Sequence, residues 1–167
     1  MSNTIFQQAC DEIHHVHDLI FKTFTIPGAE GQAALSELLT HFTPEFSMTG
    51  ISGAVVDLAA VTAMFTRIQG QRQGAPIETA EYQCVSLTEN TISVRYQETQ
   101  HFAGSTTARR SLVILRREDN GKWRWHYLHE TPLSASNSAP RTNLPRVRSG
   151  GCRYFKNNNI HLPSIHT

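Results

Sequence analysis

The sequence predicts an α+β fold, with three N-terminal helices packed on one strongly curved antiparallel sheet. Apolar residues recur at steps of three and four in much of the first 70 residues, which is the period of a helix buried on one side. From residue 77 to residue 131 the period changes to two, which is the period of a strand. Helices and strands separated along the chain in this way are typical of α+β domains, with the helices on one face of the sheet.

Three helices are predicted before residue 70. The first spans about residues 4–24 and ends before Pro27, and the second spans about residues 30–41 and ends before Pro44. Proline ends a helix because it lacks an amide donor and restricts the residue before it. The third helix spans about residues 58–69, and Asp57 is placed to cap its N-terminus.

Five strands are predicted. A short strand covers residues 45–50, and four long strands cover residues 77–87, 91–102, 111–117 and 122–130. The last two are joined by a turn that contains Asn120-Gly121, a pair that tolerates the positive φ of a tight reversal. We expect this hairpin to be the central part of the sheet.

The chain divides into a folded domain, residues 1–131, and a C-terminal extension, residues 132–167. The extension is rich in Pro, Ser and Asn and has no sustained period, so we expect it to be irregular. It carries five basic residues and no acidic one, whereas residues 1–130 carry 14 acidic and 10 basic residues. We therefore expect no nucleic-acid partner for the domain. Binding through the extension would weaken steeply with added salt.

The composition points to neither a membrane nor an oxidising compartment. No apolar run approaches the ~20 residues of a membrane span, and the N-terminus has no basic segment followed by an apolar one. Cys10, Cys84 and Cys152 are odd in number and far apart, so neither a disulfide framework nor a cysteine-rich zinc site is expected. We expect a cytoplasmic protein.

Three segments near the end of the predicted domain resemble the nuclear-transport-factor-2-like superfamily, which includes the SnoaL-like and cystatin-like α+β cones. The segments are Ala108-Arg109-Arg110-Ser111-Leu112-Val113, Gly121-Lys122-Trp123 and His129-Glu130-Thr131. The order of the predicted elements over residues 4–131 is similar as well. The sequence resembles small bacterial stand-alone members of unassigned function.

The resemblance implies a bent sheet that wraps the first helix, a pocket at the open end of the cone and, frequently, a homodimer. It implies a small-molecule-binding domain, either a cofactor-independent isomerase, dehydratase or cyclase, or a non-catalytic association or ligand-binding module with a vestigial pocket. Whether the protein is an enzyme stays open, because a fold does not determine a function. We expect no cofactor, since the sequence has no Gly-rich phosphate loop, Gly-x-Ser-x-Gly elbow or His-Glu-x-x-His motif.

The isomerase branch of the resembled superfamily places a carboxylate base on the strand that follows the second helix. The matching strand offers Ser47, Met48 and Thr49, none of which abstracts a carbon-bound proton at neutral pH. Its one acidic residue, Glu45, is expected in solvent at the start of the strand. This difference counts against isomerase chemistry at this strand and favours the association module.

Tyr96, Glu98 and Arg110 are candidate site residues on the long strands. Each shares a strand face with aliphatic residues, so we expect all three to point into the cone. In one interpretation Arg110 holds an anionic or carbonyl ligand, Tyr96 donates a hydrogen bond to it, and Glu98 orients it or transfers a proton. In the other, Glu98 and Arg110 form a structural ion pair. Arg109 is expected on the opposite face, in solvent or in an interface.

The last strand leaves two arrangements open. Its aromatic face also carries His129, and its other face carries Glu130. If the aromatic face forms a dimer interface, Glu130 lines the pocket, and if it forms the core, His129 does. A β-bulge would exchange the two. Both are therefore candidates, His129 for proton transfer and Glu130 for binding.

Histidines cluster on the first helix. His14 and His17 are three residues apart and close to Asp18, and two imidazoles with a carboxylate can hold a divalent metal. A solvated polar face explains the same residues more simply, so no metal site is predicted. His17 is expected at the mouth of the pocket as a binding residue.

Overall fold

The computed structural model describes residues 2–134, while Met1 and residues 135–167 lie outside the described residues, and with them nearly all of the predicted extension. The described elements are α1 (Ser2–Thr25), α2 (Gly28–Leu39), β1 (Phe42–Thr49), β2 (Val55–Asp57), α3 (Leu58–Ile68), β3 (Gly74–Leu87), β4 (Thr91–Phe102), β5 (Ser105–Arg117) and β6 (Trp123–Leu133). The predicted α+β class, with three helices before the long strands, is confirmed.

The strands form one six-stranded sheet in the order β2-β1-β6-β5-β4-β3. The hairpin of β5 and β6 lies at its centre, as predicted, and β3 to β6 are antiparallel throughout. The sheet is nevertheless mixed, because β1 pairs with β6 in parallel. β1 and β6 are far apart in the sequence, so no hairpin turn forces them to run in opposite directions.

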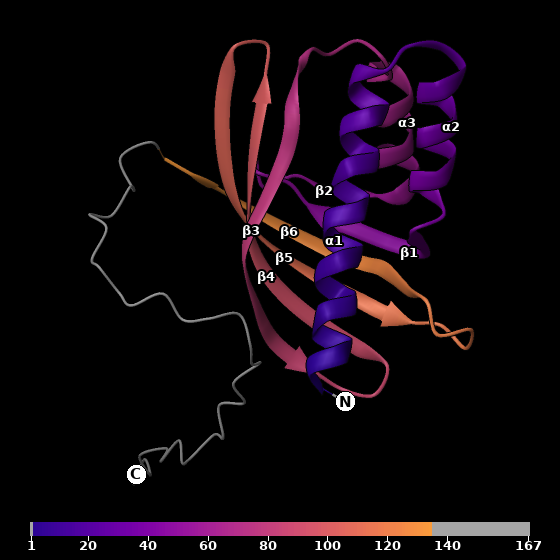
Figure 1. Ribbon diagram of the computed structural model, residues 1–167, viewed down its shortest axis with the longest axis vertical. Helices are drawn as coiled ribbons and strands as arrows, with labels where there is room; N and C mark the ends of the chain where they lie inside the picture. Colours follow the sequence, from indigo (N-terminus) through magenta and orange to yellow (C-terminus); the bar gives the residue numbers. More distant parts are fainter. Residues whose placement is uncertain (1, 135–167) are drawn as a thin grey trace, which may run out of the picture.

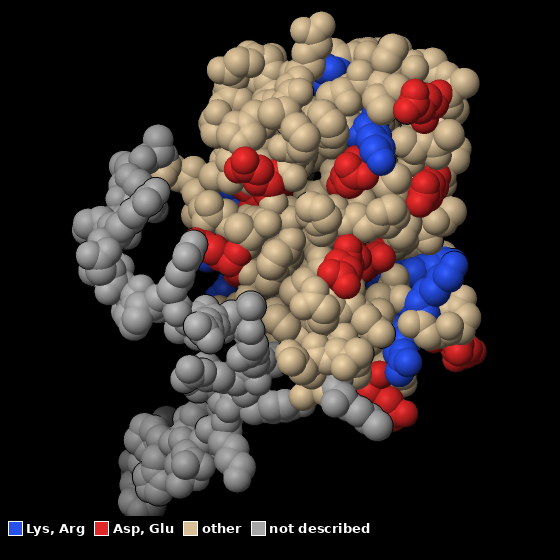
Figure 2. Space-filling view, viewed as in Figure 1, with Lys and Arg blue, Asp and Glu red and all other residues tan. Residues whose placement is uncertain are grey.

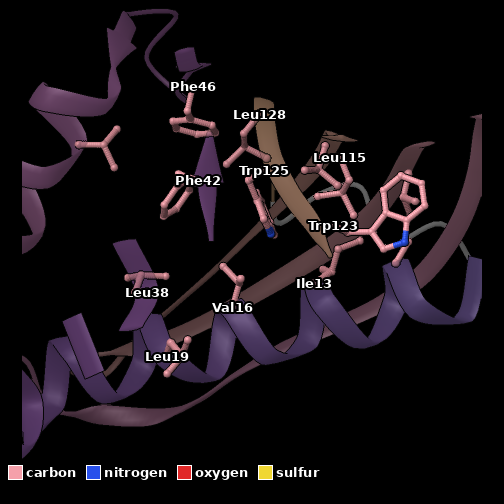
Figure 3. Close-up of a cluster of buried hydrophobic side chains, with 14 of the residues drawn as sticks. Ile13, Val16, Leu19, Leu38, Phe42, Phe46, Leu115, Trp123, Trp125 and Leu128 are labelled. Carbon is pink, nitrogen blue, oxygen red and sulfur yellow. The ribbon is translucent and has the colours of Figure 1, made fainter. Parts of the chain in front are cut away.

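The three helices lie on one face of the curved sheet, and α1 runs along that face (Figure 1). α1 turns Ile13, Val16 and Leu19 towards the sheet, where Trp125 and Leu128 of β6 complete the buried cluster (Figure 3). Burial of this stripe, rather than helix propensity alone, holds a long helix in place in a globular protein.

The helix boundaries follow the predicted signals closely. The Asp57 side chain accepts a hydrogen bond from the Ala60 amide at 2.9 Å, so it caps α3 as predicted. Pro44 does not itself end α2. The helix already ends at Leu39, and β1 begins at Phe42 and contains the proline. The pairing of β1 with β6 is irregular between Phe42 and Ser47, and a proline without an amide donor is accommodated at such an irregularity.

Two further segments differ from the sequence prediction. The short strand β2 pairs with the end of β1 and is absent from the prediction. β6 continues to Leu133, two residues beyond the predicted end of the domain, because Pro132 and Leu133 still pair with β5. The boundary between domain and extension therefore stays a prediction, now displaced towards the C-terminus.

A two-residue turn determines which side chains of β4 and β5 face the helices. Ala103 and Gly104 connect the strands with φ values of 51° and 74°, and two consecutive positive φ values characterise a tight hairpin turn. The turn places Glu98 directly opposite Arg109. Residues directly opposite each other in an antiparallel pair lie on the same face of the sheet, so both side chains point towards the helices.

A β-bulge determines the facing of β6. Ile114 pairs with Tyr127 and Leu115 pairs with Trp125, which leaves His126 as an extra residue in β6. The alternation of side chains changes phase at this residue. Trp125 before the bulge and Leu128 after it are consequently both buried.

Charged side chains are interspersed on the surface of the domain. Lysine and arginine side chains lie among aspartate and glutamate side chains on the face that Figure 2 shows. Residues 2–134 contain 14 acidic and 10 basic residues, a net charge of −4 with neutral histidines. No helix within residues 2–134 has the length and apolar character needed to span a membrane.

Candidate functional site

A cavity of about 530 Å³ lies between α1, α3, β1 and the inner face of the sheet. Large apolar side chains form most of its wall, among them Phe24, Phe42, Phe46, Met48, Phe65 and Ile68. Ile51 and Met64 also line the cavity and remain 49% and 37% exposed, so its mouth is apolar as well. Exposed apolar side chains around an opening are typical of an entrance for an apolar ligand.

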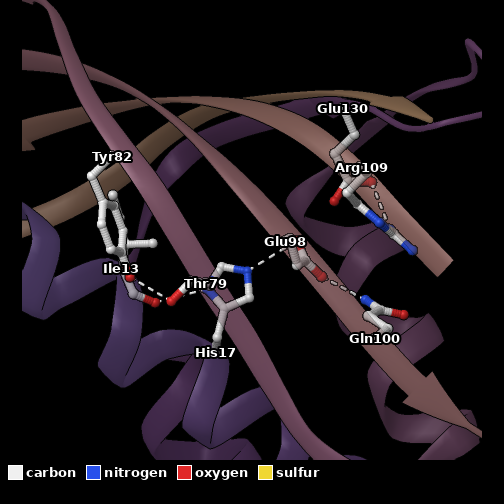
Figure 4. Close-up of polar contacts among 8 residues, drawn as sticks. All are labelled: Ile13, His17, Thr79, Tyr82, Glu98, Gln100, Arg109 and Glu130. Atoms are coloured by element: carbon white, nitrogen blue, oxygen red, sulfur yellow. Dashed lines mark hydrogen bonds and ion pairs between the residues drawn. The ribbon is translucent and has the colours of Figure 1, made fainter. Parts of the chain in front are cut away.

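The polar part of the wall is built around His17 of α1 and Glu98 of β4, each only 3% exposed. His17 Nε2 lies 3.1 Å from Glu98 Oε2, and His17 Nδ1 lies 2.7 Å from the backbone oxygen of Ile13 (Figure 4). A carbonyl and an ionised carboxylate only accept hydrogen bonds, so both ring nitrogens of His17 donate. The arrangement therefore holds an imidazolium beside a carboxylate.

Three further polar side chains extend this group across the neighbouring strands. Gln100 Nε2 donates to Glu98 Oε1 at 2.6 Å, and Arg109 Nη1 donates to Glu130 Oε2 at 3.2 Å (Figure 4). All three line the cavity together with His17 and Glu98. β4, β5 and β6 are adjacent in the sheet, which is why residues more than 30 positions apart meet here.

The environment shifts the pKa values of the two carboxyl groups in opposite directions. Burial favours the neutral form of Glu98, but His17 and then Arg109 and Gln100 outweigh it and lower the pKa of Glu98 to about 2. Burial and the charge of Glu98 raise the pKa of Glu130 above its usual value of 4.5, although Arg109 opposes the shift. Burial alone would lower the pKa of His17, but the charge and hydrogen bond of Glu98 raise it.

Two buried donors at the cavity have no hydrogen-bond partner among the described residues. They are Nε of Arg109 and Nε1 of Trp125. A buried donor without a partner costs free energy, and such groups in folded proteins call for an explanation such as a ligand. Of the two, Arg109 contacts Glu130, so its Nε can donate to an oxygen atom of a molecule bound beside Glu130.

The structure reverses the predicted orientations of Arg109 and Arg110. Arg109 points into the cavity, whereas Arg110 lies on the outer face, where its Nη2 is 3.2 Å from Glu81 Oε2. The predicted inward orientation of Arg110 and its ion pair with Glu98 are wrong. Both faces of β5 carry aliphatic residues, so the alternation along this strand does not reveal which face is buried, and a choice shifted by one residue moves every side chain to the other face.

In β6 the structure selects Glu130 rather than His129 for the cavity. His129 is exposed on the outer face, and its Nδ1 lies 2.9 Å from the hydroxyl of Tyr127. The two tryptophans of this strand are nevertheless in the core, an arrangement that a regular strand cannot combine with an inward Glu130. The bulge at His126 reconciles the two.

The remaining candidates are placed as follows. Tyr96 is fully buried, as its predicted inward direction requires, but it packs between Tyr82 and His17 and does not line the cavity. His17 is buried in the wall and not at the mouth, whereas His14 is exposed. In β1 the Met48 side chain lines the cavity, so the structure places no acid–base group at that position.

Sequence reasoning missed Arg109, Gln100 and Trp125 as site residues. A partial signal for Arg109 was present, because Gly104 lies between two alternating strands and suits a two-residue turn over residues 103–104, although Ala103 is not a residue that such turns favour. That turn implies the pairing of Arg109 with Glu98. Nothing in the sequence distinguishes the unpartnered nitrogen of Trp125 from that of an ordinary core tryptophan.

The curved sheet, the helices on one face and the cavity between them define an α+β cone with an internal pocket. The crystal structure of a nuclear-transport-factor-2-like protein of unknown function from Pseudomonas aeruginosa is similar to it. That protein is 31% identical, superposes with a TM-score of 0.69, and is aligned over 76% of this chain and 99% of its own. The chain belongs to the nuclear-transport-factor-2-like superfamily, as the resemblance implied.

More distant structures share the fold. A nuclear-transport-factor-2-like protein from Rhodospirillum rubrum is 15% identical with a TM-score of 0.52, over 60% of this chain and 85% of that one. A ketosteroid isomerase-like protein from Erwinia carotovora atroseptica is 15% identical with a TM-score of 0.50, over 62% and 84%. No protein-family model and no curated protein sequence matches the chain.

Proposed function

We propose that this chain binds a small, largely apolar organic molecule that carries a carbonyl or hydroxyl group, and that it catalyses a cofactor-independent proton transfer on this molecule, as an isomerase or a dehydratase does. The observation that supports this most is the pair of buried carboxyl groups on one cavity wall, Glu98 and Glu130, with pKa values shifted in opposite directions. Two carboxyl groups separated in this way can take different roles in acid–base catalysis.

Glu130 is the proposed general base. Its raised pKa brings it closer to neutral pH, where a base is both deprotonated and able to take a proton from carbon. The unpartnered Nε of Arg109 donates to the substrate oxygen on which negative charge develops. Trp125 Nε1 is a second unpartnered donor in the cavity wall, at the opposite end of β6 from Glu130. Glu98, kept ionised by His17, fixes the electrostatic field of the site rather than moving a proton.

The apolar wall indicates the class of ligand. A volume of about 530 Å³ is within the ~300 to 1,000 Å³ that is typical of pockets for drug-sized molecules. Such pockets combine apolar walls with a few polar groups that orient the ligand. A cyclic enone, a steroid or a small aromatic carboxylate matches this distribution. The fold shared with a protein described as ketosteroid isomerase-like supports the same class.

A non-catalytic ligand-binding or association module is the second candidate. It is favoured by β1, where Ser47, Met48 and Thr49 stand at the position that the resemblance assigns to a base. The predicted homodimer is compatible with both candidates, and light scattering of the purified protein measures it. The aromatic residues of β6 give no support for the homodimer, because Trp123 and Trp125 are buried in the core and not on an outer face.

The test measures binding and proton transfer separately. Cyclic enones, steroids and aromatic carboxylates are first screened by the melting temperature of the full chain, which a ligand of the native state raises. Compounds that bind are then incubated in D₂O, and deuterium incorporation next to the carbonyl group is followed by NMR. We expect Arg109→Leu to abolish the rise in melting temperature. We expect Glu130→Gln to retain binding and to lose exchange by a factor of about 10² to 10⁴.

Arg110→Leu is the matched control, because Arg110 is the neighbour of Arg109 on the outer face and should leave binding and exchange unchanged. Binding that survives Arg109→Leu contradicts the proposed site. Exchange that survives Glu130→Gln contradicts the proposed base. Binding without any exchange in the wild type selects the non-catalytic candidate.

A further inference from the structure

A second histidine–carboxylate cluster lies on the surface, where α1 meets the end of α2 and the start of β1. His15 Nε2 is 3.2 Å from Glu37 Oε1, and His41 Nδ1 is 2.6 Å from Glu12 Oε1. One ligand atom each from His15, Glu37 and His41 lies within 4.8 Å of the others. None of these four residues lines the internal cavity, so the cluster is independent of the proposed function.

We propose that His15, Glu37 and His41 bind a divalent transition-metal ion of the zinc class, with Glu12 as the positioning residue for His41. Two imidazoles and one carboxylate form a ligand set that suits Zn²⁺, whereas Mg²⁺ and Ca²⁺ prefer oxygen ligands alone. Three protein ligands leave the fourth tetrahedral position open to water or to another ligand.

The observed distances can contract to a metal site by side-chain rotation. In a tetrahedral site with bonds of about 2.0 to 2.1 Å, neighbouring ligand atoms are about 3.4 Å apart. The side chains of His15 and Glu37 are 47% and 56% exposed, so they can rotate without disturbing the core. The rings of His15 and His41 are already close, with centroids 5.2 Å apart.

His41 is the most firmly held of the three ligands. Its side chain is 18% exposed, and its Nδ1–H donates to Glu12, whose side chain is 15% exposed. This hydrogen bond leaves the lone pair of Nε2 for a metal. A histidine that donates its second nitrogen to a carboxylate is the usual orienting arrangement around bound zinc. The backbone is also fixed, because the Trp125 amide donates to the His41 carbonyl oxygen at 2.8 Å.

The charge around the cluster permits a cation. Lys122 and Arg124 line the same surface recess and oppose a positive ion. Arg124, however, is held by Glu118 at 3.0 Å, and Glu12 and Glu37 supply two negative charges directly at the cluster. A bound ion would join α1 to the segment between α2 and β1, and it would therefore stabilise the folded protein.

The test uses the full chain purified without a histidine tag and freed of metal. Zn²⁺ is titrated by calorimetry and by melting temperature, with Mg²⁺ as the comparison ion, and Co²⁺ is added to look for the visible absorption of tetrahedral coordination. We expect one Zn²⁺ per chain and a rise in melting temperature of about 5 °C or more at a hundredfold excess over Kd. Mg²⁺ should produce no rise.

Point substitutions identify the side chains that bind the metal ion. His15→Ala and His41→Ala should each lose at least tenfold in affinity for Zn²⁺ and lose the Co²⁺ absorption, and Glu12→Gln should weaken binding about 10- to 100-fold. His14→Ala is the matched control, because His14 is the exposed neighbour of His15 outside the cluster and should bind as the wild type does. The proposal is overturned if wild-type protein binds no Zn²⁺, or if His15→Ala binds it as tightly as His14→Ala. Circular dichroism of each variant identifies any loss that is due to unfolding.

Discussion

His15 and His17 are two residues apart on α1 and face opposite sides of the helix. Each forms a hydrogen bond with a glutamate. His15 Nε2 lies 3.2 Å from Glu37 Oε1, and His17 Nε2 lies 3.1 Å from Glu98 Oε2. The side chains of the first pair are 47% and 56% exposed, and those of the second are 4% and 3% exposed. The same two residue types at the same distance therefore occupy entirely different environments.

The difference shows how burial changes the chemistry of one pair of side chains. In the interior water solvates neither His17 nor Glu98, so each charged form is stabilised by the other, and the proton stays on His17. At the surface water solvates both His15 and Glu37, and the interaction between them is weak. The weak contact between His15 and Glu37 can be exchanged at little cost for bonds from both side chains to a metal ion.

Removing each glutamate gives the largest predicted contrast. Glu98→Ala leaves the protonated imidazole of His17 buried without a counter-charge, and we expect it to lower the free energy of unfolding by about 3 to 5 kcal/mol. Glu37→Ala removes the solvated partner and should cost about 0 to 1 kcal/mol. Urea unfolding of metal-free protein at neutral pH measures both changes. Equal costs for the two variants would contradict the contrast between interior and surface.

The acid limb of the stability curve sharpens the same contrast. The pKa of Glu98 is about 2 in the folded protein, below its usual value of 4.5, so the ionised group stabilises the fold above about pH 4.5. This contribution is lost as the pH falls from 4.5 towards 2. At about 1.4 kcal/mol per pKa unit, the loss is on the order of 3 kcal/mol.

Glu98→Gln provides the comparison for this pH dependence. Its stability should fall less steeply than that of the wild type between pH 4.5 and 2, whatever its stability at neutral pH. The raised pKa of Glu130 acts with the opposite sign, since its contribution is present at low pH and is lost as the pH rises through the raised value. Glu130→Gln should remove that loss. If the free energy of unfolding fell equally steeply with pH in wild type and in Glu98→Gln, the pKa of Glu98 would not be lowered in the folded protein.

The smallest predicted contrast concerns two tyrosine hydroxyl groups. The hydroxyl of buried Tyr96 makes no well-formed hydrogen bond among the described residues, although the hydroxyl of Ser111 in the paired position of β5 is close enough to oppose the rise in the pKa of Tyr96. The hydroxyl of Tyr127 on the outer face lies 3.0 Å from Thr49 Oγ1 and 2.9 Å from His129 Nδ1. Tyr96→Phe removes an unsatisfied buried group, so we expect no loss of stability and a gain of up to about 1 kcal/mol.

Tyr127→Phe serves as the counterpart and should cost about 0.5 to 1 kcal/mol, because it breaks hydrogen bonds that are made. Thermal unfolding of the two variants beside the wild type measures the difference. A clear loss of stability in Tyr96→Phe would mean that its hydroxyl has a partner in the folded protein.

Much of the fold was predictable because its signals are local. The stripe of α1, the cap at Asp57 and the turn at Gly121 act over a few residues, and the structure confirms all three. The parallel pairing of β1 with β6 was not predictable in this way. This pairing depends on where the chain enters the sheet after the helices, and no short segment of the sequence specifies that position.

The candidate site was predicted in part. Glu98 faces the cavity as predicted, and Glu130 faces it in one of the two arrangements that the sequence left open, while Arg110 and His129 lie on the outer face. The errors have one cause. A strand whose two faces both carry apolar or aromatic residues does not reveal its buried face, and a turn or a bulge of one residue reverses the assignment.

The sequence by itself determined the class of fold, because hydrophobic period, capping and turn chemistry act between near neighbours, and its resemblance to known members indicated the superfamily. Only the tertiary structure decided which charged side chains meet. The pairing of Glu98 with Arg109 follows from a two-residue turn, the inward position of Glu130 follows from a bulge, and the separation of His15 from His17 follows from their angle around α1. Each places a charge in the interior or in water, and that choice determines its chemistry.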